Sequence, residues 1–412
     1  MVIKNAFKNQ VIQNILWLVC EKFVTVGMIF YSEGMIARLL SNYQYGQWVY
    51  TLNLVTLMSS LALIAGAEVA VPALSRNKKI ANEIMSNVFF IRIVFAIFAY
   101  LIVTIYAAVF VKDIFLKDLL HILSLIIIFN EPFSIVINYF QSIVKIRSVV
   151  VYRMLALSIR TLFVYVCFKY SVNSSVLAWS RVLEAFFLAV LLIGVWKYYK
   201  FEVVLNNRVF NVVILRGLYF WPSLLLMYIY LRVDRFFVEH YLSFSVLAIY
   251  GVAVQFVEQS FVLIKMILQS AAPMYIYKKQ SKSELILRLV KLIVLMLVIS
   301  ISIITLSYWL LPYLVDMVFG EKYKPASELT IYMLPALIFF SIDNVLMQYI
   351  YREKLGKEMM IKWSAGLIIM AVSYYIYFSY LKYSNLYIIY NFNYFIMAMI
   401  TSIIFIRKLR HA

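Results

Sequence analysis

Long apolar segments recur along the whole chain, and the short loops between them hold most of the charged residues. A transmembrane helix needs about 20 apolar residues, and the chain holds about twelve segments of that length. The pattern therefore predicts an all-α integral membrane protein with about twelve transmembrane helices. The expected spans lie near residues 11–36, 47–73, 84–111, 117–141, 148–170, 174–196, 211–232, 244–275, 286–312, 328–350, 360–380 and 384–406.

The longest connection on the basic side of the membrane runs from Lys197 to Asn211 and separates two sets of six spans. We therefore expect an N-terminal six-helix bundle over residues 1–200 and a C-terminal one over 201–412. Duplicated bundles of this kind place a substrate path between the repeats. Kinks or static bends are expected at the prolines inside or near the ends of spans, which are Pro72, Pro132, Pro222, Pro273, Pro312 and Pro335.

The loops alternate between strongly basic and nearly neutral. Arg76, Lys78 and Lys79 follow the second predicted span, and the basic set also includes Lys362, at the start of the eleventh. Basic loops stay in the cytosol, so this alternation predicts a multi-pass protein of the cytoplasmic (inner) membrane with both termini cytosolic. The net charge of +19 is then an orientation signal that also attracts anionic lipid, and nucleic acid is not expected as a partner.

A chain that is 65% hydrophobic and 14% charged is not a soluble globule. The two cysteines, Cys20 and Cys167, lie in apolar segments and define no disulfide framework. The sequence contains no phosphate-binding glycine loop, no HExxH motif and no nucleophile elbow. We therefore expect a carrier rather than an enzyme, with no metal and no cofactor beyond H+ or Na+ as a candidate coupling ion.

Charged residues inside the predicted spans are the strongest functional signal. Each costs roughly 2.5–3.5 kcal/mol at mid-membrane, so these side chains must face one another or a hydrated cavity. The charged set is Glu21, Lys22, Glu33, Glu68, Arg92, Glu131, Arg160, Arg181, Glu184, Glu258, Lys265 and Asp343. Several spans also carry polar stripes, and the eighth presents Gln255, Glu258, Gln259, Lys265 and Gln269 at helical spacing.

Some of these charges have plain structural interpretations. Arg181 and Glu184 are three residues apart and can form an ion pair on one helix. Arg92 and Glu33 lie toward span ends, where snorkelling to the interface is favoured. Arg232, Asp234 and Arg235 mark the outer end of the seventh span, as a local salt-bridge cluster or as a substrate gate.

Three stretches resemble the polysaccharide exporter branch of the multidrug/oligosaccharidyl-lipid/polysaccharide flippase superfamily, specifically Wzx-type O-antigen flippases. The first, Ala37 to Ser75, contains Tyr45-Gly46 at the position of the family's usual tyrosine-glycine pair. The second, Arg232 to Glu258, follows the family's "D-R … Y … A" pattern, although the order Tyr250-Gly251 departs from the commoner "G-x-Y". The third is VFGEKYKPASEL, Val318 to Leu329.

The resemblance implies two six-helix bundles in a V-shaped transporter that works by alternating access. It implies as substrate an undecaprenyl-pyrophosphate-linked oligosaccharide for O-antigen in lipopolysaccharide biosynthesis, flipped from the inner to the outer leaflet. A polysaccharide polymerase and a chain-length regulator are then candidate partners.

A pyrophosphate crossing hydrocarbon needs neutralising cations. The candidates for binding pyrophosphate or sugar are Lys22, Arg160, Arg181, Lys265, Gln255 and Gln269. Acids placed where ionisation is costly are candidates for coupling to an ion gradient, namely Glu21, Glu68, Glu131, Glu258 and Asp343.

Three alternatives stay open at this point. A drug or cation antiporter of the same superfamily would share the fold, and the mixed charge of the spans does not decide against it. A polytopic polymerase or acyltransferase would need a large outer loop or a catalytic histidine, whereas His121 and His240 are isolated. An exporter of capsule or teichoic acid would differ only in its substrate.

Overall fold

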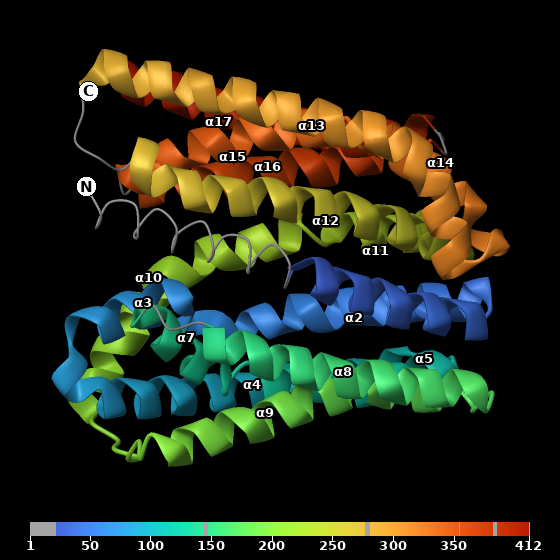
Figure 1. Cartoon of the computed structure of the whole chain (residues 1–412), viewed down its shortest axis with the longest axis horizontal. Helices are drawn as coiled ribbons and strands as arrows, with labels where there is room; N and C mark the ends of the chain where they lie inside the picture. Colours follow the sequence, from blue (N-terminus) through green and yellow to red (C-terminus); the bar gives the residue numbers. More distant parts are fainter. Residues whose placement is uncertain (1–21, 144–146, 277–280, 354, 382–384, 412) are drawn as a thin grey trace, which may run out of the picture. The chain divides into compact units, whose positions relative to one another are not determined.

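The computed structural model describes residues 22–143, 147–276, 281–353, 355–381 and 385–411, and within these ranges it is helical and without strands (Figure 1). Ten helical segments are long and apolar enough to cross a membrane, and an eleventh follows if a helix pair bent by 49° counts as one span. The first predicted span begins outside the described residues, and its described part, residues 22–39, is helical. The predicted all-α membrane fold is thus confirmed.

The contacts divide the chain into two compact units, Met1–Ser41 with Leu61–Leu218, and Asn42–Ser60 with Tyr219–Ala412. Two helices, α2 (Asn42–Ala62) and α10 (Asn207–Tyr230), pass from one unit into the other. The expected halves, residues 1–200 and 201–412, remain a prediction about functional repeats.

Unit 1 consists of residues 22–39 followed by short and long helices that run back and forth (Figure 1). After the helix over residues 22–39 its elements are η1 (Leu63–Ala65), α3 (Ala67–Arg76), η2 (Lys78–Ile80), α4 (Ala81–Phe110), α5 (Ile114–Leu123), α6 (Leu125–Asn130), α7 (Ser134–Ser142), α8 (Arg147–Lys169), η3 (Ser174–Ala178), α9 (Trp179–Tyr198) and the start of α10. Helices α8 and α9 pack side by side, as do α6 and α9.

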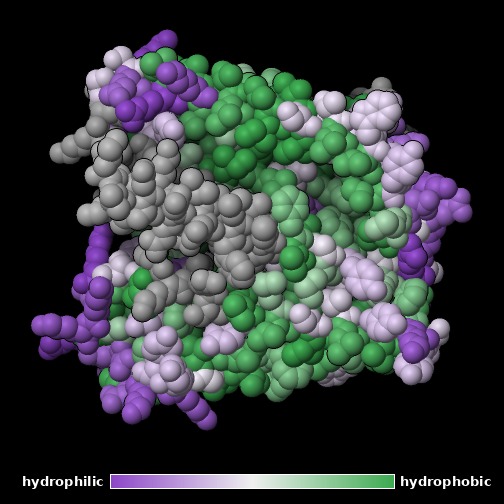
Figure 2. All heavy atoms as spheres, in the orientation of Figure 1, coloured by the Kyte–Doolittle hydropathy of each residue, from purple (hydrophilic) through white to green (hydrophobic). Residues whose placement is uncertain are grey.

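Unit 2 is built on α15 and α17, which lie against each other with α13 and α16 on either side (Figure 1). Besides parts of α2 and α10 its elements are α11 (Val233–Tyr241), α12 (Phe244–Tyr275), α13 (Lys282–Phe319), η4 (Glu321–Tyr323), α14 (Lys324–Met333), α15 (Ala336–Arg352), α16 (Gly356–Ile376), η5 (Tyr377–Leu381) and α17 (Leu386–His411). The visible sides of the helices are mainly apolar and the polar residues gather at helix ends (Figure 2), as a membrane requires.

Several spans are broken rather than continuous. Gly66 separates η1 from α3, Pro132 lies between α6 and α7, and Pro335 lies between α14 and α15. Proline removes a backbone donor, so two of these breaks follow directly from the sequence. The break at Leu231–Arg232, between α10 and α11, has no proline. Carbonyls released at such breaks need donors inside the protein, because lipid offers none.

Candidate functional site

Four of the intramembrane charges in unit 1 form one network, which is buried at Arg160 and Glu33 and partly exposed at Arg181 and Glu184. Arg160 of α8 and Arg181 of α9 each place Nη2 2.5 Å from Oε1 of Glu33. Oε2 of Glu184 lies 3.4 Å from Nη1 of Arg160 and 3.9 Å from Nη1 of Arg181. Among the residues that the structure describes, two guanidinium groups therefore meet two carboxylates.

The network corrects one expectation and refines two others. Glu33 is buried, so its predicted snorkelling to the interface is wrong. The predicted pairing of Arg181 with Glu184 exists, but both side chains also belong to the larger network. Arg160 is fully buried, whereas a quarter of the Arg181 side chain is exposed. Of the two arginines predicted to bind pyrophosphate, Arg181 is thus the more accessible.

Arg92 of α4 holds two helix breaks together. Its Nε and Nη2 donate to the carbonyl of Ala65 over 3.1 and 2.5 Å, at the break before α3. Its Nη1 donates to the carbonyl of Glu131 over 3.4 Å and to Oγ of Ser134 over 2.6 Å, at the break before α7. Because Arg92 is only 1% exposed, the expected snorkelling is wrong here too. A guanidinium suits this position since it presents several donors in one plane.

The residues predicted as a gate form a charged cluster in unit 2 around the break between α10 and α11. Nη1 of Arg235 donates to Oδ1 of Asp234 over 2.8 Å and to the Leu231 carbonyl over 2.5 Å. Its Nη2 pairs with Glu258 of α12, and Nη1 of Arg232 lies 3.3 Å from the same carboxylate. The predicted local salt-bridge cluster is therefore present, and the gating role stays a prediction.

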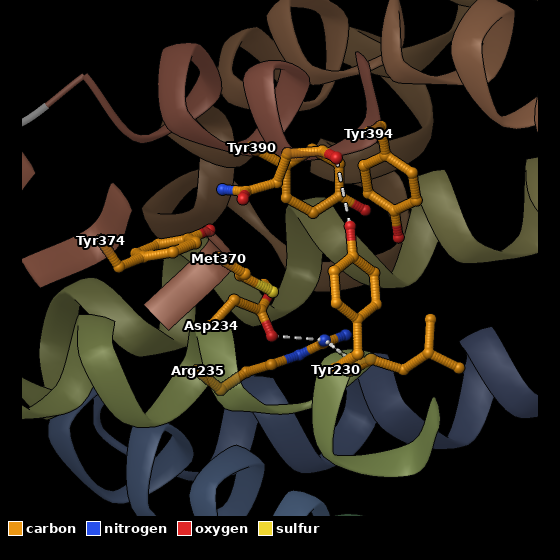
Figure 3. Close-up of a pocket in the computed structure, with 9 residues that line it drawn as sticks. Tyr230, Asp234, Arg235, Met370, Tyr374, Tyr390 and Tyr394 are labelled. Atoms are coloured by element: carbon orange, nitrogen blue, oxygen red, sulfur yellow. Dashed lines mark hydrogen bonds and ion pairs between the residues drawn. The ribbon is translucent and has the colours of Figure 1, made fainter. Parts of the chain in front are cut away.

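Asp234 and Arg235 face a small pocket whose other lining residues are mostly tyrosines, together with Leu231, Met370 and Asn393 (Figure 3). Tyr374 of α16 and Tyr390 and Tyr394 of α17 contribute to this lining. Outside the pocket wall, Oη of Tyr250 donates to Oδ2 of Asp234 over 2.6 Å. Asp234 is 2% exposed, so its charge is compensated by Arg235 and this hydroxyl rather than by water.

A second charged site in unit 2 contains a lysine that the sequence analysis assigned to a basic loop. Lys362 of α16 is fully buried and places Nζ 2.6 and 2.9 Å from the two carboxylate oxygens of Asp343 on α15. Oγ1 of Thr401, on α17, donates to Oδ1 of Asp343 over 2.5 Å. Lys362 lies within a membrane-spanning helix, so its place among the loop cations was wrong. Asp343 had no basic partner within the predicted spans, and this was the signal in the sequence that could have identified Lys362 as a buried cation.

Lys265 of α12 differs from these neutralised cations. It lies in the span Phe244–Leu268, is exposed, and forms no ion pair with the residues that the structure describes. Its ammonium group lies 5.3 Å from the centroid of the Phe340 ring, which stacks on Phe261 at 4.0 Å. A lysine that contacts the face of an aromatic ring, and no carboxylate, keeps its positive charge available to a bound anion.

The remaining predicted residues are more dispersed. Lys22 is the first described residue of its helix, and Glu21 lies outside the described residues. Glu68 is exposed on α3, while Glu131 lies at the break before α7, beside Arg92. Gln255 is half-buried on α12, the helix that also carries Gln269, whose side chain lies outside the described part of the chain. The structure thus groups Glu33 with the arginines of unit 1 and Glu258 with the predicted gate.

Parts of the three stretches that carry the family resemblance meet within unit 2. The ring of Tyr45, from the first stretch, packs edge-on against Tyr323 of the third at 5.5 Å between centroids. A Cβ on Gly46 would lie 1.8 Å from the carbonyl oxygen of Phe244, which belongs to the second stretch. Gly320, from the third, adopts φ 91°, a conformation that favours glycine. The residues that carry the family resemblance therefore lie where α2, α12 and η4 pack against one another.

The fold is that of membrane transporters. The chain has a TM-score of 0.72 with the lipid II flippase MurJ in an inward closed conformation, at 14% identity over 96% of this chain and 87% of that one. A transporter of the MOP superfamily from Pyrococcus furiosus gives 0.70 at 12% identity over 96% and 95%, and an inward-facing multidrug resistance MATE family transporter gives 0.69 at 12% over 93% and 95%. These TM-scores establish a common fold.

The family is established by sequence. Residues 4–328 match the model of a family described as polysaccharide biosynthesis protein, which covers more than half of the chain. None of the curated protein sequences matches. The chain is therefore a multi-pass membrane protein whose fold is similar to that of these transporters. It belongs to the polysaccharide biosynthesis protein family, and the resemblance drawn from the three stretches is confirmed at that level.

Proposed function

We propose that the chain is a flippase for undecaprenyl-pyrophosphate-linked oligosaccharide, moving repeat units of O-antigen or a similar surface polysaccharide to the outer leaflet of the cytoplasmic membrane. The proposal places both termini in the cytosol, where the basic loops lie. A polymerase and a chain-length regulator would receive the product. Family membership and the transporter fold support this function, and the MurJ neighbour is itself named a lipid II flippase.

Lys265 is the observation that carries the proposal. The other deep basic groups described above already have acceptors: Arg160 and Arg181 pair with Glu33, Arg235 pairs with Asp234 and Glu258, and Lys362 pairs with Asp343. Lys265 is exposed within a membrane-spanning helix, and a bare ammonium there is costly unless an anion or water meets it. A pyrophosphate group supplies such an anion.

The aromatic surroundings of Lys265 suit the rest of this substrate. Phe340 and Phe261 are buried and stack on each other behind Tyr394, a half-buried ring whose centroid lies 5.0 Å from that of Phe261. Aromatic faces can pack against the apolar faces of sugar rings. We expect Lys265 to hold the pyrophosphate while Tyr394 and Gln255 contact the first sugar.

Ion coupling is part of the proposal. Glu258 and Asp343 are each held by a basic side chain, so protonation or cation binding at either acid would release Arg232, Arg235 or Lys362. A released cation would be available to the pyrophosphate. Coupling through H+ or Na+ would in this way link the state of the carboxylates to substrate affinity.

The test compares Lys265→Met with Lys265→Arg and with Lys291→Met, an exposed lysine on neighbouring α13. Each variant is returned to the source strain after deletion of the gene, and surface polymer and externally accessible lipid-linked oligosaccharide are measured. We expect Lys265→Met to lose most surface polymer and to retain lipid-linked units on the cytosolic side. The other two variants should restore the polymer.

Two results would contradict the proposal. Unchanged surface polymer in the deletion strain, together with new drug sensitivity, would identify an antiporter. Single units already displayed outside, without polymer, would identify a polymerase. Full restoration of the surface polymer by Lys265→Met would be compatible with a flippase but would show that Lys265 is not needed for transport.

A further inference from the structure

A cavity in unit 1 lies between α3, α4 and the start of α10. Its volume is about 190 Å³, and its apolar wall includes Val69, Ile84 and Val213. Arg208 and Arg216 of α10 contribute its charged rim. The cavity is smaller than the sites that hold drug-sized ligands, which begin at about 300 Å³. It is therefore too small for an oligosaccharide and suits a segment of hydrocarbon chain.

The charge around this cavity is one-sided. Arg208 and Arg216 are exposed and form no ion pair with the residues that the structure describes, and Arg76 at the end of α3 is followed by Lys78 and Lys79 of η2. Two acids are sequence neighbours of lining residues. Glu68 precedes Val69, and Glu83 precedes Ile84 and accepts a hydrogen bond from Asn206 over 2.6 Å. Among the described residues the basic side chains are thus in excess, which favours a bound anion.

The depth of Arg216 places this anion at the membrane interface. It lies nine residues beyond the start of α10, about 14 Å along the helix axis at the α-helical rise. The same end of unit 1 carries the basic loops and so faces the cytosolic leaflet, where anionic lipids attract arginine and lysine. A phosphate with an attached hydrocarbon chain matches both the rim and the wall.

We infer that this cavity binds an anionic phospholipid of the cytosolic leaflet, with the phosphodiester between Arg208 and Arg216 and part of one acyl chain against Val69, Ile84 and Val213. The site is separate from Lys265 and does not depend on the proposed flippase function. A lipid here would brace α10 against α3 and α4, just before α10 passes into the other unit.

The experiment is lipid titration of the purified full chain by native mass spectrometry. Phosphatidylglycerol and phosphatidylcholine with the same acyl chains serve as probes, and inorganic phosphate is the competitor without a chain. The variants are Arg208→Gln with Arg216→Gln, and Val212→Trp, which fills the cavity from an exposed lining position. Lys197→Gln with Lys200→Gln is the matched control, since these exposed lysines lie at the same end of unit 1 outside the cavity.

We expect wild type to retain phosphatidylglycerol in preference to phosphatidylcholine, and the double arginine variant to bind it about thirtyfold more weakly. Val212→Trp should also weaken binding, whereas the lysine control should match wild type. Equal retention of the two lipids by wild type would overturn the inference even if a variant failed to fold. So would unchanged binding in the arginine variant or in Val212→Trp, or full displacement by inorganic phosphate.

Discussion

Buried charge pairs are the main feature of this protein at the scale of single residues. Lys362 is fully buried, and its partner Asp343 also accepts a hydrogen bond from Thr401. Removing one partner of such a pair leaves the other charge buried without compensation, which typically costs more than the pair itself contributes. The pair therefore makes the packing of α15, α16 and α17 dependent on two side chains.

Lys362→Met should lower the free energy of unfolding by about 3–5 kcal/mol, because Asp343 would remain buried and uncompensated. Adding Asp343→Leu to this variant should recover most of that loss, since no buried charge then remains. Denaturant unfolding in detergent measures both. Additive losses in the double variant would show that the two residues act independently.

Residue spacing revealed which charges are unusual but not which of them meet. Glu33 and Arg160 are 127 residues apart, so no helical periodicity relates them. Arg181 and Glu184, one turn apart, were paired correctly because helix geometry alone brings them together. Lys362 was missed since it lies near the end of its span, among basic residues that fit the orientation signal. The functional roles of Lys22, Lys265 and the predicted coupling acids stay predictions.

At the scale of elements, helix breaks and close helix approaches define the packing. Arg92 supplies donors to the carbonyls of Ala65 and Glu131, one at each of two breaks. Prolines made the breaks at Pro132 and Pro335 predictable, whereas the one at Arg232 carries no such local signal. Arginine donors then replace the missing helical N–H groups.

Arg92→Lys should destabilise the chain by about 3 kcal/mol although the charge is retained, because one ammonium group cannot reach both breaks. Ser134→Ala removes a single acceptor of Arg92 and should cost about 1 kcal/mol. Thermal unfolding of the two variants in the same detergent makes the comparison. Equal losses would mean that Arg92 does not join the breaks.

Gly46→Ala tests the approach of α2 to α12. The added Cβ would meet the Phe244 carbonyl at 1.8 Å, so the helices must separate, and we expect a loss of about 3 kcal/mol, at the upper end for overpacking. Gly194→Ala is the control, because nothing lies within 4 Å of its Cβ position. That helical substitution should stabilise by about 0.5–1 kcal/mol. A harmless Gly46→Ala would contradict the close approach.

At the scale of the whole molecule, the hydrophobic pattern was sufficient for the fold class and nearly all of the spans. Each predicted span that falls within the described residues overlaps a helix, since a span must be long and apolar to cross the bilayer. The pattern could not show that residues 42–60 associate with the C-terminal unit, because that grouping arises from contacts distant in sequence. Orientation rests on charge alone and can be tested directly.

The orientation predicts that Asn77 faces the cytosol and Asp113 the outside, since α4 connects their loops across the membrane. We expect Asp113→Cys, in a background with Cys20 and Cys167 replaced by alanine, to react with a membrane-impermeant maleimide on intact cells. Asn77→Cys should react only after the membrane is opened. Asn77 is exposed and Asp113 is half-buried at the start of α5, where its side chain accepts from the Leu116 N–H over 2.9 Å. The reversed labelling pattern would invert the topology. It would also move Arg208 and Arg216 away from the anionic cytosolic leaflet, so the lipid inference depends on this result and the fold does not.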